Sequence, residues 1–217
     1  MGSRRTLARF LETIDDFDEP RIDLEQYLTP PELAAHLCQV ADLQDDLSGE
    51  TVVDLGTGTG MLAIGASIAE PERVIGVDVD SAAVSVAANN ARVLQGRTRP
   101  EWVIGDVTRL PLSITDATVV SNPPFGAQDG RRHADRHFLE VARRIGSVSY
   151  TIHNQGSEGF VEAYADDNGG RVTHAFAASF PVDHRFEFHT ADREVLDVEL
   201  FRIEWSDEIS SDDRPES

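Results

Sequence analysis

The chain has 217 residues, a length that suits one α/β domain with a sizeable buried core. It carries 39 acidic residues against 19 basic ones, a formal net charge of −20, and every basic residue is an arginine. This composition is typical of proteins adapted to a high-salt cytoplasm, where dense carboxylates keep a protein solvated and the ionic strength screens their repulsion. A negative surface disfavours nucleic acid as a partner at ordinary salt, but molar salt weakens that exclusion because it screens every charge pair.

Neither disulfides nor metal ions are expected to hold this chain together. Cys38 is the only cysteine, which excludes an intrachain disulfide and a cysteine-based metal site. His133 and His137 are four residues apart, but no carboxylate accompanies them at a standard metal spacing. Residues 1–10 contain arginines without a following apolar run, and no stretch approaches the length of a membrane span. We therefore expect a soluble, cytoplasmic protein.

The first 45 residues predict two helices ahead of the first strand. Apolar residues recur at helical spacing over residues 4–14, which predicts a short amphipathic helix with a solvated arginine face. A second helix should start with the two prolines at 30–31, since proline is favoured in a first helical turn. We expect Thr29 to cap this helix, with Glu32 supporting the cap as in a capping box.

A glycine-rich turn follows the first predicted strand. Residues 51–55 form the strand, Gly56-Thr57-Gly58-Thr59-Gly60 follows directly, and a helix begins at Met61. Strand, glycine turn and helix make up the cofactor-binding unit of doubly wound folds, in which glycines let the backbone approach a ligand. The spacing departs from the Gly-x-Gly-x-x-Gly of dinucleotide binding, which argues against a nicotinamide enzyme. A second strand, residues 73–77, ends in Asp78, whose carboxylate could accept both hydroxyls of a ribose. Residues 81–94 predict a helix with Asp80 or Ser81 as its cap.

Two further strands end in polar groups. Residues 101–104 predict a third strand, after which the Asp106 carboxylate could accept a hydrogen bond from an exocyclic adenine amine. The apolar run 117–121 predicts a buried strand that leads into Asn122-Pro123-Pro124-Phe125. The two prolines end this strand and stiffen the loop, which presents one amide, two backbone carbonyls and an aromatic face.

The second half of the chain predicts a basic cluster and two long strands. Arg131, Arg132 and Arg136 belong to the densest basic cluster of this acidic chain and lead into a helix. Residues 171–180 and 195–205 show alternating patterns, which favours two antiparallel strands. We expect residues 1–205 to form one domain and the acidic, polar residues 206–217 to be disordered.

Taken together, these motifs resemble class I S-adenosylmethionine-dependent methyltransferases that act on amino nitrogens. The order and spacing of the glycine loop, Asp78, Asp106 and the Asn-Pro-Pro-Phe loop carry the resemblance. Leu24-Glu25-Gln26-Tyr27-x-Thr29 and Phe186-x-Phe188-His189 further resemble the methyltransferase-like protein 5 family, which makes N6-methyladenine in small-subunit ribosomal RNA.

The resemblance covers roughly residues 20–205 and, with the acidic composition, suggests a haloarchaeal member of the family. It implies a Rossmann-like α/β methyltransferase fold. The expected sheet has seven mostly parallel strands with an antiparallel last strand, and helices cover both faces. Residues 1–45 would cover the cofactor site.

The resemblance also implies roles for individual residues, position by position. Asn122, Pro123, Pro124 and Phe125 would receive the target adenine, and Arg131, Arg132 and Arg136 would contact RNA. Relatives in this family carry lysines after the loop, where this chain has Arg131 and Arg132, so the positive charge is kept. The residues implied around S-adenosylmethionine are Gln26, Tyr27, Thr29, Asp54, Gly56, Thr57, Gly58, Gly60, Asp78, Val79, Asp106, Val107 and Asn122.

A protein partner is implied as well. Eukaryotic members of the family work with a small zinc-ribbon activator protein that adds a strand to the open edge of the sheet. By position, Glu101-Trp102-Val103-Ile104 would be that edge strand of a heterodimer, with Trp102 as the anchor. The alternative is that Trp102 belongs to the core.

Two other functions remain open at this point. Methylation of a glutamine side chain in a release factor uses a similar loop, although its aromatic residue is typically tyrosine and an extra amino-terminal domain is expected. A non-catalytic cofactor-binding scaffold in ribosome assembly is the other alternative, and the intact Asn122 and glycine loop argue against it.

Overall fold

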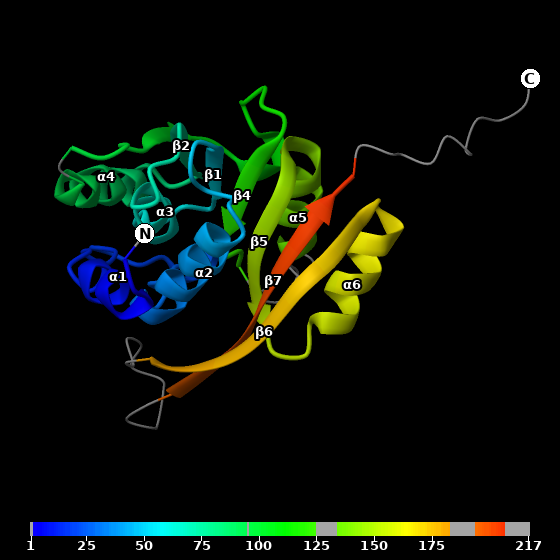
Figure 1. The fold of residues 1–217 in the computed structure, drawn as a ribbon. Helices are drawn as coiled ribbons and strands as arrows, with labels where there is room; N and C mark the ends of the chain where they lie inside the picture. Colours follow the sequence, from blue (N-terminus) through cyan, green and yellow to red (C-terminus); the bar gives the residue numbers. More distant parts are fainter. Residues whose placement is uncertain (1, 95, 125–133, 183–193, 207–217) are drawn as a thin grey trace, which may run out of the picture.

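The computed structural model describes residues 2–94, 96–124, 134–182 and 194–206 of the chain. Seven strands form one sheet (Figure 1). The strands are β1 (Thr51–Leu55), β2 (Arg73–Asp78), β3 (Glu101–Ile104), β4 (Ala117–Ser121), β5 (Gly146–Asn154), β6 (Gly170–Val182) and β7 (Glu194–Trp205).

The sheet has the order β3-β2-β1-β4-β5-β7-β6. The first five strands of this order pair in parallel, whereas β7 runs antiparallel to both of its neighbours, β5 and β6. This is the predicted fold class: a mostly parallel seven-stranded sheet with an antiparallel last strand.

Helices cover both faces of the sheet, as predicted (Figure 1). Helices α1 to α4 lie on one face, where apolar side chains of α1, α2 and α3 share a core with Val52 and Tyr150 of the sheet. Helices α5 and α6 lie on the other face. Within the described residues, no helix is long and apolar enough to cross a membrane. The helices are α1 (Arg4–Leu11), α2 (Pro31–Leu43), α3 (Met61–Ser67), α4 (Ser81–Asn90), α5 (Ala134–Ile145) and α6 (Glu158–Asp167), with 3-10 turns at Ile22–Leu24, Ala91–Val93 and Val107–Arg109.

The predicted capping box of α2 is wrong. The helix begins at Pro31, its N-cap is Pro30, and no side chain makes a cap hydrogen bond. The Thr29 hydroxyl instead accepts a hydrogen bond from the side-chain amide of Asn122, at 2.9 Å. A tertiary hydrogen bond has therefore replaced the local cap that the sequence favours.

Two predicted helices are shorter than expected. The predicted helix 4–14 ends at Leu11, because the following amides, Thr13 and Ile14, bond to carbonyls three residues back rather than four. The predicted helix 81–94 is α-helical only to Asn90 and then tightens into the 3-10 turn. Asp80 caps its start, accepting a hydrogen bond from the Ala82 amide at 2.9 Å.

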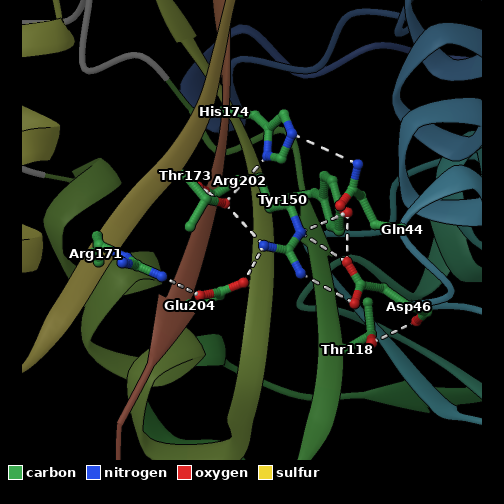
Figure 2. A network of polar contacts seen from close by, with 9 residues as sticks. All are labelled: Gln44, Asp46, Thr118, Tyr150, Arg171, Thr173, His174, Arg202 and Glu204. Atoms are coloured by element: carbon green, nitrogen blue, oxygen red, sulfur yellow. Dashed lines mark hydrogen bonds and ion pairs between the residues drawn. The ribbon is translucent and has the colours of Figure 1, made fainter.

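A buried polar network ties the end of α2 to the sheet (Figure 2). The guanidinium of Arg202, in β7, makes two hydrogen bonds to the Asp46 carboxylate, at 2.8 and 3.2 Å. The Tyr150 hydroxyl donates to the same carboxylate at 2.5 Å, and Glu204 accepts from Arg202 at 2.6 Å. We call this set of four side chains the Arg202 clasp. It fixes the segment after α2 against β5 and β7, which in turn sets where α2 ends above the sheet.

The strand order brings the predicted polar residues to one edge of the sheet. Since β3, β2, β1 and β4 are adjacent and parallel, their carboxyl ends lie side by side. The chain leaves β1 in one direction toward β2 and β3, and β4 lies on the other side. This reversal is the topological switch point at which open α/β sheets bind ligands.

Candidate active site

A cavity of about 760 Å³ opens at the carboxyl ends of these four strands. Its volume falls within the range of small-molecule and cofactor sites. Twelve of the predicted site residues line it: Gln26, Tyr27, Thr29, Gly56, Thr57, Gly58, Asp78, Val79, Asp106, Val107, Asn122 and Pro124.

The glycine loop forms the floor of the cavity between β1 and α3. Gly56 and Gly58 have φ angles of +70° and +53°, which residues other than glycine rarely adopt. The amides of Gly56 and Thr57 both donate to the carbonyl of Val77 in β2, at 2.9 Å. The loop is therefore fixed by its backbone, and the absence of Cβ atoms lets neighbouring groups lie close to it.

The Asp78 carboxylate lies at the end of β2 and is largely buried. One oxygen accepts from the Gly58 amide at 2.8 Å and the other from the Asp80 amide at 2.9 Å. Burial raises the pKa of Asp78, and the backbone hydrogen bonds partly oppose that rise. A carboxylate has about four lone-pair sites, so Asp78 can accept further hydrogen bonds, such as those that ribose hydroxyls donate.

Gln26 connects the amino-terminal segment to the start of α4. Its side-chain oxygen accepts from the Arg21 amide at 2.8 Å, and its side-chain nitrogen donates to Asp80 at 2.8 Å. The hydrogen bond from Gln26 is the main reason that the pKa of Asp80 lies below its usual value. Gln26 thus closes this side of the cavity by binding protein groups.

The wall beyond Asp78 combines an apolar side chain with a carboxylate. Val79 is 56% exposed and lines the cavity, where it offers an apolar face to a flat ligand. Asp106 follows β3, and one of its oxygens accepts from both the amide and the hydroxyl of Thr108, at 2.8 Å. These hydrogen bonds lower the pKa of Asp106, so it remains a carboxylate with one oxygen available to an amine.

Three of the described residues that were predicted around the cofactor and the adenine do not line the cavity. Asp54 lies behind the glycine loop, 1% exposed, and accepts from the Thr57 hydroxyl at 2.6 Å and the Ala63 amide at 3.0 Å. A Cβ atom on Gly60 would lie 2.9 Å from Trp102, so this glycine is required for packing within the fold. Pro123 is buried beside the lining residues Asn122 and Pro124.

The Asn122 side chain is held by two residues of the amino-terminal segment. The Tyr27 hydroxyl donates to Asn122 Oδ1 at 3.2 Å, and Asn122 Nδ2 donates to the Thr29 hydroxyl at 2.9 Å. Burial raises the pKa of Tyr27 far above its usual value, which keeps this hydroxyl protonated as a donor. The amide is therefore fixed before any ligand binds, and its oxygen retains a second lone pair.

Sequence reasoning missed two aromatic walls of the cavity. A Cβ atom on Gly58 would lie 2.9 Å from the ring of Phe17, and one on Gly56 would lie 3.0 Å from Phe138. His137 also lines the cavity, and its ring lies 3.2 Å from Glu140. In the sequence, Phe138 stands out only as an apolar position of a predicted helix. No sequence pattern indicates that Phe17 lines the cavity. Other lining residues that were not predicted are Leu24, Glu25, Thr59, Met61 and Thr108.

The predicted RNA-contacting residues are only partly described. Phe125, Arg131 and Arg132 lie outside the described residues, as does the Phe186-x-Phe188-His189 motif. Arg136 is exposed at the start of α5, where its guanidinium lies 3.5 Å from Glu140 and over the ring of Tyr164. No group of three or more potential metal ligands occurs in the part of the chain that the structure describes.

Comparison with known proteins identifies the family. A model of the ribosomal protein L11 methyltransferase family (PrmA) matches residues 35–122. The rRNA N6-adenosine-methyltransferase Mettl5 of Drosophila melanogaster is 31% identical over 205 residues, which cover 92% of this chain and 95% of the fly protein. The chain belongs to the METTL5 family.

Solved structures agree with this assignment. A proposed RNA methyltransferase from Pyrococcus horikoshii is 37% identical, has a TM-score of 0.85, and is matched over 94% of this chain and 98% of its own. The magnesium protoporphyrin IX methyltransferase of Synechocystis, solved with bound S-adenosylmethionine, shares the fold at a TM-score of 0.60 and 16% identity, over 80% of this chain and 78% of that one. This METTL5 family member is an S-adenosylmethionine-dependent methyltransferase.

The residues present fit that cofactor. Asp78 offers acceptors for two ribose hydroxyls, Val79 offers an apolar face for a purine, and the free oxygen of Asp106 suits an exocyclic amine. One oxygen of Asp54 has no hydrogen-bond partner among the described residues, although it is buried just behind the glycine loop. Such an atom suits a cationic or water-bridged neighbour.

Proposed function

We propose that this METTL5 family member transfers the methyl group of S-adenosylmethionine to N6 of an adenine in small-subunit ribosomal RNA. The single observation that carries the proposal is the fixed amide of Asn122 at the end of β4, on the wall of the cofactor cavity. A similar activity is named for the Drosophila relative. Gln26, Asp78, Val79, Asp106 and the glycine loop would hold the cofactor, which supplies an electrophilic methyl group.

The chemistry at the target requires orientation more than a strong base. The N6 lone pair of adenine is delocalised into the ring, so the amine is a poor nucleophile until it is held in place. A flipped-out adenine would donate its two N6 hydrogens to Asn122 Oδ1, through the lone pair that Tyr27 leaves free, and to the carbonyl of Pro123. One N6 proton would become acidic as the nitrogen takes the methyl group from the sulfonium, and it would leave to water as the thioether product forms, so positioning would supply most of the rate.

Residues beyond the described part of the chain would complete the RNA site. We propose that Phe125 stacks on the target base, an interaction worth about 1–3 kcal/mol. Arg131 and Arg132 would bind phosphates next to it, together with Arg136. The ion pair between Arg136 and Glu140 is exposed and so would be exchanged for a phosphate at little cost.

We propose further that an activator protein of the zinc-ribbon type pairs with β3. This strand is at the end of the strand order, so one of its edges carries no partner strand among the described residues. Trp102 is not well placed as the anchor, because its indole lies over Gly76 and Gly60 within its own fold. Ile104, which is 59% exposed, is the better apolar contact. A fully active, stable protein without any partner would count against this pairing.

The experiment that tests the function is transfer of labelled methyl from S-adenosylmethionine in molar potassium chloride. The substrate is small-subunit ribosomal RNA from a strain that lacks this gene, with and without the candidate activator. Label recovered as N6-methyladenine is the expected result. Label in protein glutamine would replace the proposal by the release-factor activity, and cofactor binding without transfer would indicate a scaffold.

A further inference from the structure

A chain of four polar side chains lies behind the Asn-Pro-Pro-Phe loop. The hydroxyl of Ser121, the last residue of β4, donates to the hydroxyl of Thr151 in β5 at 3.3 Å. Thr151 Oγ1 lies 3.0 Å from Nε2 of His153, two residues further along β5. On its other side, His153 Nδ1 lies 3.6 Å from Oδ2 of Asp135 in the first turn of α5. The chain thus joins three separate elements.

The middle of this chain is closed off from solvent. Ser121, Thr151 and His153 are 2%, 1% and 1% exposed, and the ring of Phe201 packs edge-on against His153 at 5.8 Å. Buried polar groups require partners, and here each group supplies one for the next. Since Ser121 donates to Thr151, the Thr151 hydroxyl can donate to Nε2 of His153, and a proton on Nδ1 would face Asp135.

The two ends of this chain of polar side chains, Ser121 and Asp135, flank the substrate loop. Ser121 immediately precedes residues 122–134 and Asp135 immediately follows them, so His153 is connected to both ends of this segment. The segment begins with Asn122 and contains Phe125. We propose that His153 is a positioning residue for methyl transfer, which holds the two ends of residues 122–134 at a fixed separation and thereby aims the Asn122 amide. This role rests on the proposed function for its substrate.

The first turn of α5 gives an independent reason for this role. His137 and Phe138 lie two and three residues after Asp135, and both line the cavity. Phe138 contacts the glycine loop, where a Cβ on Gly56 would meet its ring at 3.0 Å. A shift of Asp135 would therefore move the cavity wall as well as the end of the substrate loop. A displacement of about 1 Å can lower a rate about 100-fold, so the contact between His153 and Asp135 bears directly on turnover.

The test compares three substitutions of His153 in the full-length protein with its RNA substrate. His153→Leu fills the space and removes both contacts, so we expect kcat to fall about 10-fold to 100-fold while the Kd for S-adenosylmethionine stays within about threefold. His153→Gln can still reach Thr151, and His153→Asn can still reach Asp135, so each should recover part of the lost turnover. His174→Leu is the matched control, because His174 lies in β6 and contacts Gln44, away from the cavity.

Stability measurements and hydrogen exchange separate positioning from simple destabilisation. If His153 only stabilises the fold, kcat of the folded enzyme stays at the wild-type value or falls in step with melting temperature in all three variants, and the proposal is overturned. We expect faster exchange over residues 122–135 in His153→Leu, with β2 and β3, which do not contact His153, unchanged. This readout needs no RNA, so it tests the positioning role of His153 separately from the proposed function. Failure of the proposed function would show as no methyl transfer by the wild type. If His153→Leu does not fold, the Gln and Asn variants carry the same comparison.

Discussion

The Tyr27 hydroxyl donates a hydrogen bond to Asn122 Oδ1 across 3.2 Å, although the two residues are 95 positions apart in the chain. Thr29, two residues further on, accepts from the nitrogen of the same amide. The amino-terminal segment therefore does more than cover the cofactor cavity, since it also fixes the group that we propose receives the adenine. In the function that we propose, the cofactor site and the substrate site therefore share Tyr27 and Thr29.

Removing the Tyr27 hydroxyl should loosen Asn122 without removing it. A typical hydrogen bond contributes about 0.5–1.5 kcal/mol, so Tyr27→Phe should lower kcat about threefold to tenfold. Steady-state methyl transfer checks this, with the Kd for S-adenosylmethionine measured by calorimetry. A variant that loses cofactor affinity but keeps kcat would show that Tyr27 serves the cofactor alone.

Asn122 itself should be indispensable for turnover. Asn122→Ala removes the acceptor for the N6 hydrogen and should abolish methyl transfer, with cofactor affinity changed by no more than several-fold. Single-turnover assays with saturating cofactor measure the chemical step directly. Asn122→Gln is the matched comparison, because it keeps the amide but displaces it by one methylene and should also be severely impaired. Near-normal turnover in Asn122→Ala would exclude the proposed role.

Asp54 should make the stability of the cofactor-free protein depend on pH. Burial raises the pKa of Asp54 to about 7, with hydrogen bonds from Thr57 and Ala63 opposing the rise. In the unfolded chain the pKa of an aspartate is about 4, so below about pH 4 Asp54 is protonated in both the folded and the unfolded protein. Between about pH 4 and 7, Asp54 is protonated only in the folded protein. The contribution of Asp54 to the free energy of unfolding therefore falls as pH rises through this window, by up to about 4 kcal/mol.

Asp54→Asn isolates this effect, because the amide keeps an acceptor for Thr57 and cannot ionise. Relative to the wild type, we expect the variant to be similar near pH 4 and more stable above pH 7. Urea unfolding at several pH values, in constant high salt, measures the difference. Parallel pH profiles of the two proteins would mean that Asp54 is ionised throughout and that its pKa is not raised.

The Arg202 clasp should dominate the anchoring of α2 to the sheet. Asp46→Ala removes the bidentate partner of a buried arginine, which typically destabilises a protein by about 3 kcal/mol or more. Arg73→Ala is the control, because it breaks an ion pair with Glu101 that is 2.7 Å long but exposed and lies outside the clasp. Such surface pairs contribute about 0–1 kcal/mol. Equal decreases in the free energy of unfolding of the two variants would show that the Arg202 clasp stabilises the protein no more than an exposed ion pair does.

Local sequence was sufficient for most of the framework. Hydrophobic runs predicted β1 and β4 with their observed bounds, because a strand buried on both faces must be apolar along its length. The glycine spacing predicted the loop after β1, whose glycines have positive φ in the structure, and the proline pair predicted the end of β4. These features depend on neighbouring residues only, so they can be recognised without a structure.

Local rules failed where a side chain had a distant alternative. Thr29 has the residue type and position of a cap, yet its hydroxyl binds Asn122, and the start of α2 has no side-chain cap. Gly60 matched the cofactor motif but is needed because Trp102 packs against it. In both cases the competing partner is distant in the chain, and its proximity depends on the packing of complete elements.

The sequence by itself determined the class of protein: the cofactor loop, the carboxylates after β2 and β3, and the Asn-Pro-Pro-Phe loop are each contiguous or set by strand ends. Only the tertiary structure decided which groups hold them in place. The contacts of Tyr27 with Asn122, of His153 with Ser121 through Thr151, and of Phe17 with Gly58 join segments that the strand order brings together. Hydrogen bonds and ring contacts act over a few ångströms, so such pairings appear only once the sheet order and the helix positions are fixed.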